Sequence, residues 1–220
     1  MTARKPLVII SGITQELAAT DTVAYAGSIG WFTEGYTSGN YYLCNSYAAN
    51  STSAALANGT VRATPWIVTA PVTLSMLWME FTAAGDNVSV FRLGIWNDSG
   101  SGRPGTLALD AGTISTGTSN SGTVATGGTP GVYEIAVSIT LQPGLYWVGG
   151  AVQGVTTTQP TIRTVSTGYV HTKQPLGTSL PVTAFATVGF AYSGQTGAFG
   201  TFSGAAGSAG LAPRIGFKVA

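Results

Sequence analysis

The sequence predicts an all-β protein, an antiparallel β-sandwich of jelly-roll type preceded by an extended N-terminal arm. Three observations support this class. Apolar and polar residues alternate with a period of two along most of the chain. Segments rich in Gly, Pro, Asn and Ser separate these alternating stretches at intervals of about 8–15 residues. No convincing helical pattern is longer than two turns.

The clearest strand pattern lies at residues 132–141, where every odd-numbered residue from Tyr133 to Leu141 is apolar and predicts one buried face. In the segment 88–97 a buried face is predicted for Phe91, Leu93 and Ile95, with Arg92 and Trp96 on the opposite face. The last strand, residues 214–219, has its apolar residues at the odd positions and basic residues at both Arg214 and Lys218.

A change of phase interrupts the apolar pattern between Val72 and Phe81. The apolar residues are even-numbered up to Met76 and odd-numbered from Leu77 onward, which predicts a β-bulge near Met76. Pro65 cannot donate a hydrogen bond to a neighbouring strand, so its strand is expected at a sheet edge or bent. Gln142-Pro143-Gly144 has the composition of a type II turn. Further strands are expected at 62–68, 106–114, 144–153, 160–166 and 184–193.

The composition divides the chain into three expected regions: an N-terminal arm at 1–22, an aromatic and Gly-rich linker at 23–60, and the sandwich domain at 61–220. The Gly/Ala/Ser-rich segment 194–212 does not fit a regular strand pattern. We expect it, together with the aromatic segment 25–47, to mediate self-association. Charged residues are only 8% of the chain, so large surfaces can be buried between subunits with little desolvation of charge.

The composition also excludes several functional classes. The formal net charge is +1, which does not provide the clustered basic residues that bind nucleic acids or acidic membranes. The most apolar stretch is interrupted by polar residues and is too short to span a membrane. The chain has one Cys and one His, which excludes an internal disulfide framework and a multi-histidine metal site. We expect no cofactor.

The N-terminal apolar run, residues 7–10, is shorter than the apolar core of a secretory signal peptide. We therefore expect synthesis in a cytoplasm without secretion. A low-charge β protein rich in Ser, Thr and Gly is then consistent with a particle that assembles inside a cell and is released by lysis.

The sequence offers little support for catalysis, and we expect no enzymatic activity and no catalytic residue. His171 lacks a Gly-x-Ser-x-Gly nucleophile motif, and no basic residue lies near Cys44 to lower the pKa of its thiol. None of the eight carboxylates forms a distinctive pair of the kind that glycosidases use. Asn97, Asp98 and Asp110 are the one set considered for Ca²⁺, and the sequence leaves that question open.

Aromatic residues give the strongest binding signal. Seven aromatic residues lie between Tyr25 and Tyr47, interleaved with Gly and Ser. Flat rings with polar edges stack on sugars and also anchor protein contacts. The candidates for glycan or subunit contacts are Trp31, Tyr36, Tyr41 and Tyr42. The alternative interpretation is that these rings close one end of the sandwich.

Two parts of the chain resemble structural proteins of tailed bacteriophages. The segment RKPLVIISGITQEL, residues 4–17, is similar to the N-terminal leader of such proteins. The segments FRLGIWND (91–98), RPGTL (103–107) and LQPGLYW (141–147) resemble the sandwich domains of phage minor tail and fibre proteins. The resemblance implies a virion component, usually a homotrimer, whose leader attaches it to the particle. The attachment residues would then be Lys5, Pro6, Leu7, Val8, Ile9 and Ile10.

The function expected from these observations is that of a non-enzymatic virion surface protein, a tail fibre or minor tail protein that contributes to host adhesion. Its partners would be further copies of itself, other virion proteins and a host cell-surface glycan. A head fibre or capsid decoration protein is the nearest alternative. A carbohydrate-binding module that acts alone is an alternative from another class, and a capsule-degrading hydrolase is a third.

Overall fold

A computed structural model describes residues 7–10, 13–16, 35–44, 51–117, 121–124, 130–166, 189–202, 206–208 and 210–220. The described residues form strands, turns and loops, and none of them is helical. Accordingly, no helix long and apolar enough to cross a membrane is found among them. The chain divides into two compact units, the N-terminal unit Met1–Glu34 and the body Gly35–Ala220. The prediction of an all-β protein is confirmed.

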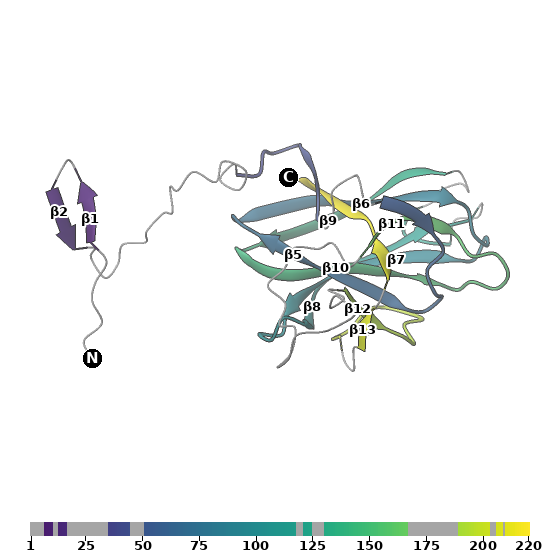
Figure 1. Cartoon of the computed structure of the whole chain (residues 1–220). Helices are drawn as coiled ribbons and strands as arrows, with labels where there is room; N and C mark the ends of the chain where they lie inside the picture. Colours follow the sequence, from purple (N-terminus) through teal and green to yellow (C-terminus); the bar gives the residue numbers. More distant parts are fainter. Residues whose placement is uncertain are drawn as a thin grey trace. The chain divides into compact units, whose positions relative to one another are not determined.

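The body contains two antiparallel sheets, an arrangement consistent with a β-sandwich (Figure 1). The six-stranded sheet has the order β13 (Ala206–Ser208), β12 (Gly189–Tyr192), β5 (Val61–Val68), β10 (Gly144–Gln153), β7 (Val90–Asp98) and β8 (Pro104–Ser115). The seven-stranded sheet has the order β14 (Leu211–Pro213), β11 (Thr161–Ser166), β6 (Val72–Ala83), β15 (Ile215–Val219) and β3 (Tyr41–Leu43). In addition, β4 (Ser51–Ala54) pairs with β11, and β9 (Gly131–Leu141) pairs with β6.

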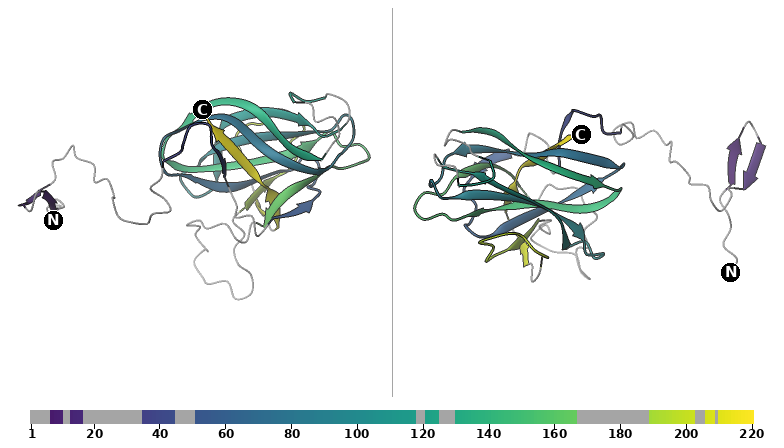
Figure 2. Two further views of the ribbon diagram at one scale, coloured as in Figure 1. Left: turned by 90° about the horizontal axis from the view of Figure 1, so that it is seen from above. Right: turned by 180° about the vertical axis from the view of Figure 1, so that it is seen from behind.

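The two sheets lie face to face (Figure 2). The side chains on their inward faces form one core. Trp66 of β5 and Phe217 of β15 meet across it with ring centroids 4.8 Å apart, and Phe81 of β6 meets Phe91 of β7 at 6.3 Å. The predicted inward residues of β7, β9 and β15 all belong to this core or pack against it. Period-two alternation therefore identified the buried face correctly for these three strands.

The predicted bulge in β6 is confirmed. On β15 the neighbours Lys218 and Val219 pair with Met76 and Leu74, so Ser75 is one extra residue on β6. Leu74 and Leu77 are both buried, because the extra residue moves the apolar series from even to odd positions. Pro65 lies in the part of β5 that pairs only with β10, since β12 pairs with Val61–Ala63.

Two sequence-based expectations need correction. Gly144 does not have the positive φ that a type II turn requires, because Gln142–Gly144 carries the chain from one sheet to the other instead of closing a hairpin. The linker expected at 23–60 does not extend to residue 60. Within it, β3 and β4 pair with the seven-stranded sheet, and Leu56 is 2% exposed in the core. The compact body therefore begins at Gly35.

The N-terminal unit contains a hairpin of β1 (Leu7–Ile10) and β2 (Ile13–Glu16). Leu7 pairs with Glu16 and Ile10 with Ile13 in antiparallel register. The four apolar residues of the expected arm thus form a strand, and this strand pairs with the chain that follows it. Two short paired strands are marginally stable in water, so a hairpin of this size gains stability when it joins another sheet.

Candidate functional site

The outward face of the six-stranded sheet is covered by residues 193–202, which follow β12 and which we call the covering segment (Figure 1). Trp96 points outward from β7, opposite to the core residues Leu93 and Ile95 that precede it. Phe199 and Phe202 of the covering segment pack on Trp96, at ring centroid distances of 5.2 and 5.4 Å. The indole Nε1 of Trp96 donates to the carbonyl of Gly200 over 2.9 Å. This sheet is therefore packed on both faces.

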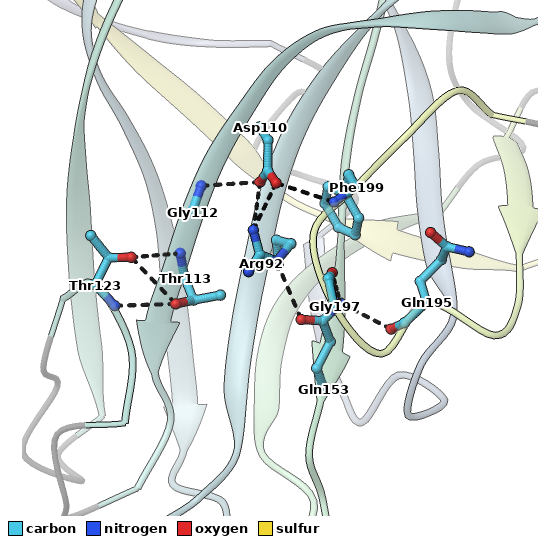
Figure 3. A network of polar contacts seen from close by, with 9 residues as sticks. All are labelled: Arg92, Asp110, Gly112, Thr113, Thr123, Gln153, Gln195, Gly197 and Phe199. Carbon is cyan, nitrogen blue, oxygen red and sulfur yellow. Dashed lines mark hydrogen bonds and ion pairs between the residues drawn. The ribbon is translucent and has the colours of Figure 1, made fainter.

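A network of polar contacts fixes the covering segment beside these rings (Figure 3). Nη1 of Arg92 donates to both carboxylate oxygens of Asp110, over 2.9 and 2.7 Å, and Nε of Arg92 donates to Oε1 of Gln153 over 3.3 Å. The amide Nε2 of Gln153 then donates to the carbonyls of Gln195 and Gly197, over 2.9 and 2.8 Å. Three neighbouring strands, β7, β8 and β10, thus contribute one side chain each.

Asp110 is the centre of this network. Besides the Arg92 guanidinium, its carboxylate accepts the backbone N–H of Gly112 at 3.2 Å and that of Phe199 at 3.1 Å. Arg92 also lies over the Phe199 ring, with its guanidinium carbon 5.9 Å from the centroid. Phe199 therefore contacts both Trp96 and the charged pair. The network orients Arg92 and neutralises its charge.

A hollow of about 290 Å³ opens next to the network, and its lining consists of described residues. The floor is formed by Val90 and Arg92, which are alternate residues of β7 and face the same way, together with Val88 from the turn before β7. Val88 is 59% exposed. The two walls come from neighbouring elements, with Thr113 and Ser121 on the β8 side and Gln153, Gly154, Thr196 and Gly197 on the β10 side.

A short reciprocal contact holds the wall on the β8 side. The backbone N–H of Thr113 donates to Oγ1 of Thr123 over 3.2 Å, and the backbone N–H of Thr123 donates to Oγ1 of Thr113 over 3.1 Å (Figure 3). Residues 121–124 thereby return alongside β8, where Ile114 and Val124 form an isolated bridge. The side of the hollow is thus formed by chain that follows β8.

The structure does not bring Asn97, Asp98 and Asp110 together as a calcium site. Asp110 is paired with Arg92, as described above. The carboxylate of Asp98 accepts from Nε1 of Trp147 at 2.9 Å and from the backbone N–H groups of Gly100 and Gly102. Asn97 donates to Thr106. Among the residues that the structure describes, no group of three or more His, Cys, Asp or Glu could hold a metal ion.

A second charged cluster lies on the seven-stranded sheet. Arg163 of β11 contacts Glu80 of β6 through two hydrogen bonds, Nη2 to Oε1 at 2.7 Å and Nε to Oε2 at 3.1 Å. Arg214 reaches the same carboxylate at 3.5 Å. The hydrogen bonds from Arg163 hold the pKa of Glu80 below its usual value, against the opposing effect of burial. These side chains link β6, β11 and the chain before β15.

The aromatic candidates fall into different environments. Tyr42 stacks on Phe217 at 5.3 Å, and Tyr36 contacts both of these rings edge-on. Burial raises the pKa of Tyr36, against the effect of its hydrogen bonds with Thr69. These two tyrosines pack against the core, and their role in glycan or subunit contacts remains an expectation. Tyr41 is 51% exposed, and the ammonium of Lys218 lies 5.0 Å from its ring centroid.

The remaining predicted residues are placed as follows. Leu7, Val8, Ile9 and Ile10 form β1, whereas Lys5, Pro6 and Trp31 lie outside the described residues, as does His171. Cys44 is buried at the edge of the core, and burial raises the pKa of its thiol well above the usual range. A buried thiol of this kind is a poor nucleophile.

Sequence reasoning did not find the polar network. The one sequence feature that could have indicated the network was Arg92, a basic residue predicted on the outward face of an otherwise apolar strand. The partners Asp110, Gln153 and the backbone of residues 195–199 lie 18 or more residues away along the chain, so only the strand register could show that they meet. Compared with known proteins, the chain matches no family model and no curated sequence.

Proposed function

We propose that the chain is a non-enzymatic surface protein of a tailed-phage virion, a tail fibre or minor tail protein that contributes to host adhesion. In this proposal the body is a jelly-roll sandwich displayed outward, and the N-terminal unit is the arm that attaches it to the particle. The head fibre or capsid decoration protein remains the nearest alternative, because it would need the same attachment and the same kind of β domain.

The division of the chain into two units carries the proposal. The body is compact from Gly35 onward, whereas the N-terminal unit has a small hairpin of its own. The free edges of such a hairpin can be extended by a strand from another protein, which is a common means of attachment. The low charge of the chain and its resemblance to phage leaders and sandwich domains point in the same direction.

The chemistry of the described residues supports a binding function over catalysis. The thiol of Cys44 is buried, and the carboxylates of Asp98 and Asp110 are occupied by N–H groups of the protein. The polar network uses its charged pair to hold the covering segment on the sheet. This construction gives a rigid surface, which suits a protein that must present the same face in many copies.

Immunogold labelling tests the proposal directly. An antibody raised against the body is applied to purified tailed-phage particles whose genome encodes the chain. Labelling of the tail is the expected result, and labelling of the head would favour the decoration protein. Particles without label, from preparations in which the chain is shown to be expressed, would overturn the proposal.

Self-association is tested separately. We propose that the full chain is a homotrimer that also contacts other virion proteins, and light scattering at micromolar concentration should give three times the mass of the chain. A strict monomer at that concentration would contradict the trimer. The label on the particle and the mass in solution are independent readouts, so either proposal can fail without the other.

A further inference from the structure

The hollow beside the polar network has a floor that differs in character from its walls. Two valines, Val88 and Val90, supply an aliphatic surface, and Arg92 ends this surface on one side. The walls carry the hydroxyls of Thr113, Ser121 and Thr196. No side chain of Gly154 or Gly197 extends over the floor, so the space between the walls stays open. A ligand that fits here must combine an apolar face with polar groups around its edge.

Arg92 is held in position before any ligand binds. Its Nη1 is committed to Asp110 and its Nε to Gln153, while Gln153 is itself held by two backbone carbonyls. Among the described residues, no hydrogen bond partner of Nη2 is found. In Figure 3, Arg92 lies between Thr113 on one side and Gln153 on the other, and both of these residues line the hollow. The network therefore presents the N–H donors of Nη2 at a fixed place, which reduces the entropy cost of binding.

We propose that this hollow binds a single neutral sugar residue of a glycan. The C–H face of a pyranose ring would lie on the two valines, and its hydroxyls would meet the N–H groups of Arg92 and the hydroxyl of Thr196. The hydroxyls of Thr113 and Ser121 already contact Thr123 and Ser89, and each would offer the sugar only its remaining hydrogen-bonding capacity. At about 290 Å³ the hollow lies at the lower limit of small-molecule sites, which suits one ring. Its open shape lets a glycan chain continue beyond that ring.

The charges favour a neutral ligand over the two main alternatives. A phosphate or a carboxylate would need a positive charge, and the charge of Arg92 is already matched by Asp110 at 2.7 Å. A metal ion would need carboxylate ligands, and both oxygens of Asp110 already accept hydrogen bonds. Sugar hydroxyls both donate and accept, so they suit a wall of hydroxyls and amides without net charge.

This inference deepens the proposed function, because it gives host adhesion a place on the body and a class of ligand. Contact with one sugar ring is weak on its own. Many copies on one particle could still hold a cell, since linked weak contacts raise the total affinity by several orders of magnitude. A deep pocket is therefore not needed, because many copies of a shallow site on one particle can together hold a cell.

NMR titration of the full isotope-labelled chain tests the inference. The probes are the methyl glycosides of glucose, galactose, mannose and N-acetylglucosamine, each added up to high millimolar concentration. At least one probe should shift the backbone signals of Val88, Val90, Gly154 and Thr196 in a saturable way. The chain with Thr196→Trp, which fills the hollow from its exposed wall, should bind that probe at least roughly tenfold more weakly.

The matched control is Thr201→Trp, because Thr201 is exposed on the same segment but does not line the hollow. This variant should keep the affinity within about twofold. The absence of saturable shifts with every probe would overturn the inference, and so would equal binding by both variants. Shifts around Tyr41 instead would move the sugar site to the other sheet and would also overturn it. Particle labelling does not depend on any of these results, so failure here leaves the proposed virion location standing.

Discussion

The ring of Phe199 occupies the space in which a side chain on Gly94 would lie. A β-carbon built on Gly94 would come within 2.8 Å of Cδ2 of Phe199 and within 2.9 Å of the Trp96 ring. Gly94 lies in the middle of β7, where glycine weakens a strand and needs a reason. The close approach of the covering segment provides that reason, since the absence of a side chain lets Phe199 sit directly on the sheet.

Gly94→Ala should therefore destabilise the protein. The added methyl group has to displace Phe199 or Trp96, and overpacking of this kind costs about 1–3 kcal/mol. Gly200→Ala is the matched control, because a β-carbon on Gly200 meets nothing within 4 Å. It should stay within about 1 kcal/mol of the parent. Urea unfolding monitored by tryptophan fluorescence measures both, and equal stability of the two variants would contradict the packing of Phe199 on Gly94.

Asp86 should make the stability of the body depend on acid pH. Its carboxylate accepts the backbone N–H groups of Thr157, Thr158 and Thr156, and these hydrogen bonds hold its pKa well below the usual value of 3.8. Because the folded-state pKa is lowered, the stabilisation is fully present above the unfolded-state pKa. It is lost as the pH falls from about 4 toward the folded-state pKa.

Asp86→Asn should then lower the urea midpoint at pH 7 and reduce the further decrease between pH 5 and pH 2. Asparagine keeps one acceptor oxygen but loses the charge that the three N–H groups solvate. Glu134→Gln removes a carboxylate for which the described residues provide no hydrogen bond donor, and it serves as the control. An unchanged acid response in the Asp86 variant would show that these hydrogen bonds do not contribute to stability.

The alternation along single strands was predictable from the sequence, and the joining of distant strands was not. Phe91, Leu93 and Ile95 could be assigned to the core because each strand carries its own two-residue period. Trp96 could be placed on the opposite face, but its burial at 1% exposed depends on Phe199 and Phe202, more than a hundred residues later. A local pattern contains no information about such a partner.

The candidate site shows the same limit of prediction from a local sequence pattern. Tyr41 and Tyr42 are neighbours in the sequence and looked equivalent, yet adjacent residues of a strand face opposite ways. Tyr42 packs on Phe217 and Tyr41 remains exposed. The boundary at residue 60 was misplaced for a related reason. The segment before it is rich in Ala, Ser and Asn and resembles a linker, but β4 supplies backbone pairing to β11 in spite of that composition.

The contact between Glu80 and Arg163 should contribute a measurable coupling energy. The pair is bidentate, and the two side chains are 21% and 29% exposed, so screening by water is incomplete. A double-mutant cycle with Glu80→Gln and Arg163→Gln should give about 1 kcal/mol at pH 7. The pKa of Glu80 is lowered in the folded state, so the coupling should persist above about pH 4.5 and vanish as the pH falls below it. A coupling that does not change between pH 7 and pH 3 would contradict the ion pair.

The boundary between the two units leads to a prediction about truncation. A chain that begins at Gly35 should fold and should keep the midpoint of thermal unfolding within about 2 °C of the full chain, because Gly35–Ala220 is compact by itself. A chain that begins at Val61 should be much less stable. It lacks β3 and β4, which pair with β15 and β11, and it lacks Leu56 in the core.

The loss of Leu56 alone supports a large effect, since removal of a buried leucine side chain costs about 2–5 kcal/mol. Tyr36 and Tyr42 would also be absent, which would uncover the end of the core at Phe217. Differential scanning calorimetry on the three chains measures the difference. Equal stability of the chains that begin at Gly35 and Val61 would show that the residues before Val61 behave as the linker expected from composition. A large loss on removal of the first 34 residues would instead show that the N-terminal unit stabilises the body, and the attachment arm would then need another interpretation.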